Sequence, residues 1–186
     1  METTMTKTRS MVQCALLAAL VAIGAFIQVP VPYMDYFTLQ FLFVLLAGML
    51  LGPARGALSV GVYVLVGLVG FPVFAAGGGI QYIFRPSFGY LLGFILAAWA
   101  AGFILKQGKS QGYWRYLLAA FGGLLVTYII GLTYKYMILN FYMAEPTPWS
   151  LVLLSCFPLD LPGDMLLCFV GAGLAHRVKP LLRGLR

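Results

Sequence analysis

Long apolar runs separated by turn residues are the feature that most restricts how this chain can fold. In hydrocarbon every backbone N–H and C=O must be paired internally, so runs of this length predict α-helices. Charged residues make up 9% of the chain, against about 25% in soluble domains. We therefore expect an all-α integral membrane protein with one domain, 1–186, and six transmembrane helices. The expected helices are 11–29, 38–52, 56–70, 87–105, 115–140 and 161–178, and the stretch 148–157 predicts a further short helix.

Basic residues gather in the segments that would lie on one side of a six-span chain. Because cytoplasmic segments of membrane proteins carry an excess of Lys and Arg, both termini are predicted to be cytoplasmic. The net charge of +7 does not indicate nucleic-acid binding, since the charges are scattered and form no basic face. The basic residues on the side predicted to be cytoplasmic are Lys7, Arg9, Arg55, Lys106, Lys109, Arg115, Arg177, Lys179, Arg183 and Arg186.

The glycine-rich segment 71–86 interrupts the apolar pattern on the opposite side. Irregular backbone at the edge of a bilayer is tolerated where it is buried in protein or lines a cavity. Arg85 is a costly charge there, and its planar fork suits a carboxylate or phosphate. Gln81 and Tyr82 could hydrogen-bond a polar ligand. The alternatives are an interfacial arginine that extends to water and a tyrosine of the interfacial belt.

A second group of polar residues lies at the same side of the chain. Asp160 and Asp164 are four residues apart at the start of the last apolar run. Asp160 is either a helix cap or a ligand contact, whereas Asp164 lies far enough inside the helix that a ligand or partner is expected. Lys135 could meet an anion or an aspartate, or extend to the surface. Thr38 and Gln40 open the second run and could face the same cavity.

Several classes of function lack the residues they need. Three cysteines show no metal-binding spacing, so no metal site is predicted. No nucleophile–base pair or phosphate-binding loop is present, so neither an enzyme, a cofactor nor a built-in ATPase is predicted. A small membrane enzyme would depend on the Asp160 and Asp164 pair. An oligomeric pore would need a polar stripe through several helices, whereas polarity at one end favours a capped pocket.

The first apolar run carries small residues at helical spacing. Ala15 with Ala19, and Ala18 with Ala22, form two small-x-x-x-small pairs that permit close helix contact in lipid. These residues predict either a docking face for another membrane protein or packing within the bundle.

Short segments in a specific order and spacing resemble the BioY family, the biotin-binding S components of energy-coupling factor (ECF) vitamin transporters. The resemblance implies a six-helix ECF S-component fold in the prokaryotic plasma membrane and high-affinity capture of biotin. It also implies partnership with a transmembrane coupling subunit and two ABC ATPases, which bind the ATP. An S component for another vitamin and a stand-alone oligomeric biotin transporter are the alternatives. The segments are Phe37-Thr38-Leu39-Gln40, Leu46-Ala47-Gly48, Leu51-Gly52-Pro53, Gly67 to Phe74, Pro86 to Gly93, and Pro162-Gly163-Asp164.

The resemblance also implies roles for particular residues. Asp164 matches the family's acid and is expected to accept hydrogen bonds from the ureido group of biotin. Many members carry a lysine three residues later, where this chain has Leu167. Arg85, helped by Lys135, is expected to meet the carboxylate. The small-residue face of the first run looks like the family's docking surface for the coupling subunit. Phe74, Tyr82, Phe84 and Tyr90 are expected to form apolar walls, and the loop 30–37 a lid.

Overall fold

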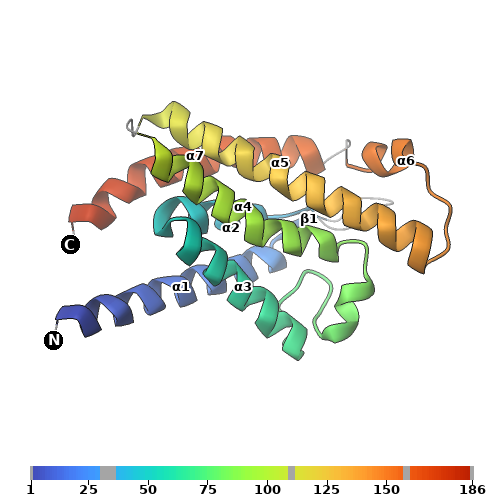
Figure 1. Cartoon of the computed structure of the whole chain (residues 1–186), viewed down its shortest axis with the longest axis horizontal. Coiled ribbons are helices and arrows are strands. Elements are labelled where there is room, and N and C mark those ends of the chain that lie inside the picture. Colours follow the sequence, from blue (N-terminus) through green and yellow to red (C-terminus); the bar gives the residue numbers. More distant parts are fainter. Residues whose placement is uncertain (1, 30–36, 109–111, 157–159, 185–186) are drawn as a thin grey trace.

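The computed structural model describes residues 2–29, 37–108, 112–156 and 160–184, and these residues form a bundle of helices (Figure 1). A two-stranded antiparallel ribbon follows the first helix and pairs Gln28 with Thr38. The elements are α1 Glu2–Phe26, β1 Gln28–Val29, β2 Phe37–Thr38, α2 Gln40–Leu51, α3 Pro53–Val69, the 3-10 helix η1 Ile80–Phe84, α4 Phe88–Gln107, α5 Tyr113–Met137, the π-helical turn η2 Ile138–Tyr142, α6 Trp149–Leu154 and α7 Asp160–Gly184.

A helix stands at each of the six predicted apolar runs, and the short helix expected within 148–157 is α6. The prediction is wrong at the end of the first run, because α1 stops at Phe26 and Gln28–Val29 is a strand. Val29 precedes Pro30, and the residue before a proline is disfavoured in helix. The polar residues before position 11 also belong to α1. A prediction based on apolar runs therefore began this helix too late, because its first residues are polar.

The turn between α2 and α3 is formed by two residues with fixed backbone preferences. Gly52 ends α2 with φ +86°, a conformation that residues with a Cβ atom rarely adopt. Pro53 then occupies the first position of α3, where its missing N–H is no loss. This turn folds α3 back against α2 without an intervening loop.

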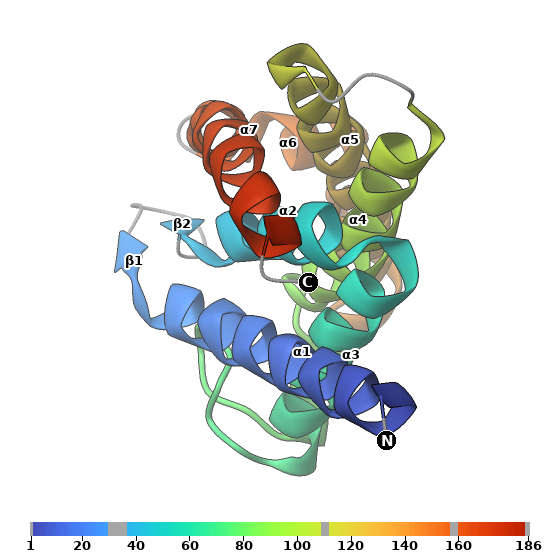
Figure 2. The same cartoon turned by 90° about the vertical axis from the view of Figure 1, so that its left-hand side faces the viewer.

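α2 lies at the centre of the bundle, in contact with α1, α3, α4 and α7 (Figure 2). Close backbone contact is possible because Gly48 has no side chain. A Cβ atom at Gly48 would lie 2.1 Å from the carbonyl oxygen of Ala98 in α4. A Cβ atom at Gly56 in α3 would lie 2.6 Å from the Cα of Gly48. Three helix backbones therefore meet at one point.

The two ends of the bundle differ in charge. Both termini, the turn between α2 and α3 and the adjoining ends of α4 and α5 lie at one end, whereas the glycine-rich segment and α6 lie at the other (Figure 1). The described basic residues near helix ends, apart from Arg85 and Lys135, fall at the end that holds the termini. These residues are Lys7, Arg9, Arg55, Lys106, Arg115, Arg177 and Lys179.

Among the described residues, three helices are long and apolar enough to cross a membrane by length and composition. They are Lys7–Phe26, Phe88–Gln107 and Tyr113–Tyr142. α2 and α3 are apolar but shorter, and α7 carries Asp160 and Asp164 in its first turns. The number of spans and their orientation stay predictions.

The contact at Gly48 generates a test of stability. We expect Gly48→Ala to destabilise the protein by about 1–3 kcal/mol, because the added methyl group would overlap backbone atoms. Gly61→Ala in α3 is the matched control, since a Cβ atom there meets nothing within 4 Å. That change should be neutral or stabilising by up to about 1 kcal/mol through helix propensity. Thermal unfolding in detergent measures both, and equal melting temperatures for the two variants would contradict the packing argument.

Candidate functional site

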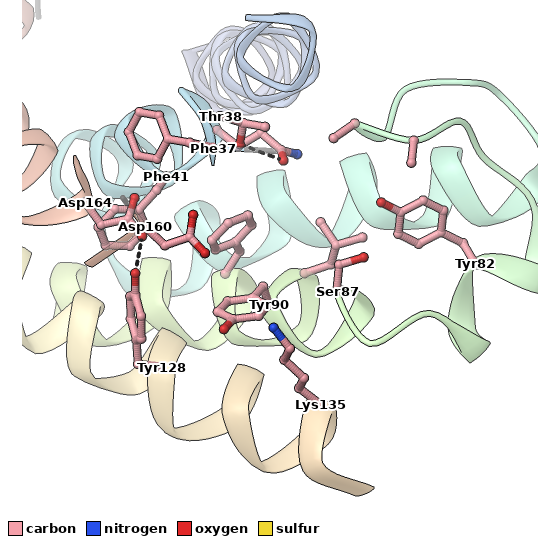
Figure 3. Close-up of a pocket in the computed structure, with 15 residues that line it drawn as sticks. Phe37, Thr38, Phe41, Tyr82, Ser87, Tyr90, Tyr128, Lys135, Asp160 and Asp164 are labelled. Atoms are coloured by element: carbon pink, nitrogen blue, oxygen red, sulfur yellow. Dashed lines mark hydrogen bonds between the residues drawn. The ribbon is translucent and has the colours of Figure 1, made fainter. Parts of the chain in front are cut away.

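A pocket opens near the end of the bundle that carries the glycine-rich segment (Figure 3). Five helical elements, two non-helical segments and the N-cap residue of α4, Ser87, supply its lining. Spacings of three, four and seven residues place the contributions of α4, α5 and α7 on single helix faces. The lining residues are Phe37, Thr38, Gln40, Phe41, Ala75, Ala76, Tyr82, Ser87, Tyr90, Leu91, Phe94, Tyr128, Lys135, Asp160 and Asp164.

Two carboxylate side chains lie on one side of the pocket. Asp160 and Asp164 stand one turn apart on α7, and both line the cavity. The hydroxyl of Tyr128 on α5 donates a 2.9 Å hydrogen bond to Oδ2 of Asp164 (Figure 3). This bond fixes the orientation of the carboxylate. A carboxylate offers about four lone-pair sites, so Asp164 can accept further hydrogen bonds from a ligand.

A lysine enters the same pocket from α5. Lys135 is half-buried, and its Nζ donates a 2.9 Å hydrogen bond to Oγ of Ser155. The Ser155 hydroxyl in turn donates to the carbonyl oxygen of Val152 in α6. Ser155 follows the last residue of α6, so this short helix positions the ammonium group. An ammonium has three donors, so others are available for an anionic ligand group.

Gln40 is held at the pocket by a chain of hydrogen bonds. Thr38 donates to its Oε1 at 3.2 Å, and its Nε2 donates to the hydroxyl of Tyr63 on α3. The Tyr63 hydroxyl donates onward to the carbonyl oxygen of Val73 at 3.1 Å. The chain sets the orientation of the amide and links it to the glycine-rich segment.

Aromatic rings form much of the remaining wall. Phe41 of α2 and Phe94 of α4 pack with ring centroids 6.1 Å apart. Tyr90 packs edge-to-face on Tyr128 at 6.0 Å, and its hydroxyl lies 3.3 Å from the thiol sulfur of Cys156. An apolar wall with a few fixed polar groups is typical of small-molecule sites.

Nine residues were predicted to bind substrate; six of them line this pocket, whereas Arg85, Gln81 and Phe74 lie elsewhere. Arg85 and Gln81 are exposed and do not contribute to the lining. The guanidinium of Arg85 lies 5.4 Å from the ring centroid of Tyr82, and Gln81 donates to the carbonyl oxygen of Gly78. The lining members of the predicted set are Gln40, Tyr82, Tyr90, Lys135, Asp160 and Asp164.

Phe74 and Phe84, which were expected as walls, occupy other environments. Phe74 is 1% exposed and packs between Tyr63 and Tyr82, at centroid distances of 5.5 and 4.6 Å. It therefore supports the wall from behind. Phe84 is half exposed and stacks on Tyr142. The predicted lid falls on 30–37, of which 30–36 lie outside the described residues.

Tyr128, Ser87, Phe41 and Phe94 line the pocket but were not predicted as site residues. Aromatic residues are frequent in this chain, so residue type alone did not distinguish Tyr128, Phe41 and Phe94 from the others. Helical spacing offers a signal in hindsight: Tyr128 lies seven residues before Lys135, which places both on one face of α5.

The alanine pairs of α1 occupy two different faces. Ala18 is buried and Ala22 half-buried within the bundle, whereas Ala15 and Ala19 are exposed. The first pair therefore packs within the chain, and the second pair remains available on the outside.

This arrangement can bind a molecule with hydrogen-bond donors at one place and a negative charge at another. Asp164 would accept from the donors, Lys135 would meet the anion, and the aromatic wall would cover an apolar body.

Comparisons with known proteins agree on one family. The model of the BioY family matches residues 1–184. A probable biotin transporter BioY of Lysinibacillus sphaericus is 42% identical over 96% of this chain and 91% of its own length. A biotin transporter BioY of Thermotoga maritima is 39% identical over 74% and 78%.

A solved structure shares the fold. It is a crystal structure of the S-component for biotin from an ECF-type ABC transporter, with a TM-score of 0.81 and 25% sequence identity. The match covers 94% of this chain and 93% of that chain. A family match over nearly the whole length and an equally extensive structural match lead to the same conclusion: the chain belongs to the BioY family.

Proposed function

We propose that this chain takes up biotin, capturing it in the described pocket as the substrate-binding S component of an ECF-type ABC transporter. The observation that carries the proposal is the pairing of an oriented acceptor, Asp164, with a positioned cation, Lys135, in one aromatic pocket. Biotin has ureido N–H donors, an apolar bicycle and chain, and a carboxylate. The names of the related proteins and of the similar structure support the same ligand.

The ligand is oriented with its ureido head at Asp164 and its carboxylate at Lys135. Tyr128 holds the Asp164 carboxylate so that the remaining lone pairs meet the ureido N–H groups. Ser155 holds the Lys135 ammonium, which is the charged group that lines the pocket on α5. Gln40 adds an amide whose orientation is fixed by Thr38 and Tyr63. Arg85 remains a second candidate for contact with the carboxylate, because its guanidinium lies beside the ring of Tyr82, which lines the pocket.

The chain crosses the prokaryotic plasma membrane six times with both termini in the cytoplasm. Support comes from the apolar helices and from the basic residues at the end that holds the termini. The pocket then faces the outside, where the vitamin is captured. No chemical reaction is assigned to the chain, since the proposed role is binding and transport.

Uptake requires a transmembrane coupling subunit and two ABC ATPases, which supply the energy. The exposed pair Ala15 and Ala19 on α1 is the proposed contact, because small side chains let a partner helix approach closely in lipid. Ala18 and Ala22 face the bundle and support α1 from inside.

Asp164→Asn should weaken biotin binding by about 1.5–3 kcal/mol, roughly 10- to 150-fold in Kd, because a charged acceptor is replaced by an amide. Tyr128→Phe should cost about 1 kcal/mol, since it removes only the bond that orients the acid. Titration calorimetry of the purified, biotin-free protein measures both. Absence of binding by the folded wild-type protein would reject the biotin proposal, and a panel of other vitamins would follow.

The carboxylate contact is tested with biotin and with biotin amide, which lacks the charge. The wild-type protein should prefer biotin, whereas Lys135→Met should bind the two ligands with similar affinity. Arg85→Gln is the matched control and should keep the preference of the wild-type protein. The opposite pattern, with preference retained in Lys135→Met and lost in Arg85→Gln, would assign the carboxylate to Arg85.

Docking is tested by adding bulk to the exposed face of α1. Ala15→Leu with Ala19→Leu should leave biotin binding unchanged but prevent co-purification with the coupling subunit and ATPases. Leu125→Phe adds bulk at an exposed position of α5 and should not affect assembly. Normal assembly of the double variant would exclude this face as the contact.

A further inference from the structure

A second hollow lies at the opposite end of the bundle from the ligand pocket. Its lining consists of Lys7, Ser10 and Met11 from α1 and Arg55 from the first turn of α3. The three α1 residues are spaced by three and four positions, so they share one face of that helix.

The two walls of this hollow are fixed against each other by hydrogen bonds just beyond it. The Ser59 hydroxyl of α3 donates to the carbonyl oxygen of Cys14 in α1 at 2.7 Å. The Cys14 thiol donates to the carbonyl oxygen of Arg55 at 3.7 Å. The backbone that carries Arg55 is therefore held beside α1, and the two cations face a common space.

The chemistry of the lining suits a phosphate group. Lys7 and Arg55 supply two positive charges, Ser10 supplies a hydroxyl, and none of the four lining residues is acidic. Arginine matches two phosphate oxygens with parallel N–H donors, and lysine adds a point charge. The hollow also lies at the basic end of the bundle, which is the end proposed to meet the anionic cytoplasmic leaflet.

An apolar stripe leads away from the hollow along α3. Leu58, Val62 and Leu65 follow Arg55 at spacings of three, four and three residues, which places them on one helix face. They are 60%, 40% and 62% exposed, and Met11 at the rim is 72% exposed. A free phosphate ion would make no use of this surface, whereas an acyl chain would cover it.

We infer that Lys7, Ser10 and Arg55 bind the phosphate of an anionic phospholipid, whose acyl chain lies along the exposed stripe of α3. The site is separate from the biotin pocket. It would anchor the first turns of α1 to the membrane surface and to α3. The headgroup charge offsets the repulsion between Lys7 and Arg55.

Native mass spectrometry of the full chain with phosphatidylglycerol tests the inference. Lys7→Gln with Arg55→Gln should weaken the tightest lipid-binding event roughly tenfold or more, as expected from about 1 kcal/mol for each cation. Lys106→Gln with Arg177→Gln is the matched control, because it removes two exposed cations outside the hollow. That control should change the affinity less than twofold, and both double variants should bind biotin as the wild-type protein does.

Four results would overturn the lipid assignment. Equal losses in the two double variants would show general attraction to a basic surface. Equal binding of phosphatidylcholine, which carries no net charge, would remove the role of the two cations. Displacement of phosphatidylglycerol by millimolar inorganic phosphate would indicate a site for the free anion, and unchanged lipid binding with impaired assembly would indicate a protein partner.

Discussion

The contact between the backbones of α2 and α4 at Gly48 is the constraint on which the rest of the bundle depends. In lipid the hydrophobic effect does not drive helices together, so close packing of small residues must do so. Here the carbonyl oxygen of Ala98 occupies the space where a Gly48 side chain would stand. This contact sets the separation of the two helices and therefore the positions of Phe41 and Phe94, whose rings pack against each other in the pocket wall. The position of this part of the wall is thus decided one to two helical turns away, since Gly48 follows Phe41 by seven residues and Ala98 follows Phe94 by four.

The charged groups of the pocket come from two helices, α5 and α7, that also pack against each other away from the site, for example through the rings of Phe121 and Phe169. Asp160 and Asp164 belong to α7, whereas Tyr128 and Lys135 belong to α5. The bond from Tyr128 to Asp164 joins the two helices directly at the site. Intramembrane carboxylates are costly, and the single hydrogen bond from Tyr128 uses only one of the roughly four lone-pair sites of Asp164, so a ligand that donates to this acid best explains its position. A site built to satisfy such groups discriminates strongly against analogues that leave them unpaired.

How far the sequence predicts this protein depends on the kind of signal. Helix positions followed from apolar runs, because backbone pairing in lipid leaves few alternatives. Asp164, Asp160 and Lys135 were predicted to contribute because charges are rare in apolar segments and each one requires a reason. Arg85 satisfied the same reasoning yet lies outside the lining, since the direction of a loop side chain depends on local turns that composition does not reveal. Tyr128 was missed because the chain has 11 tyrosines and the sequence does not show which of them lies beside Asp164. Its role becomes visible only when α7 is packed against α5.

The glycine-rich segment was predicted to be a binding site through its polar side chains, whereas its described contacts with the pocket involve mainly backbone atoms and small or aromatic residues. Only Ala75, Ala76 and Tyr82 of this segment line the pocket. Its other connection is indirect, since the Val73 carbonyl oxygen accepts from Tyr63, which in turn accepts from Gln40. Gln28, next to the end of α1, also donates to the Ala75 carbonyl oxygen. Because these bonds converge on backbone atoms of the segment, its conformation determines how the Gln40 amide is presented. A substitution that alters this backbone would therefore change ligand recognition even where the substituted side chain never contacts the ligand.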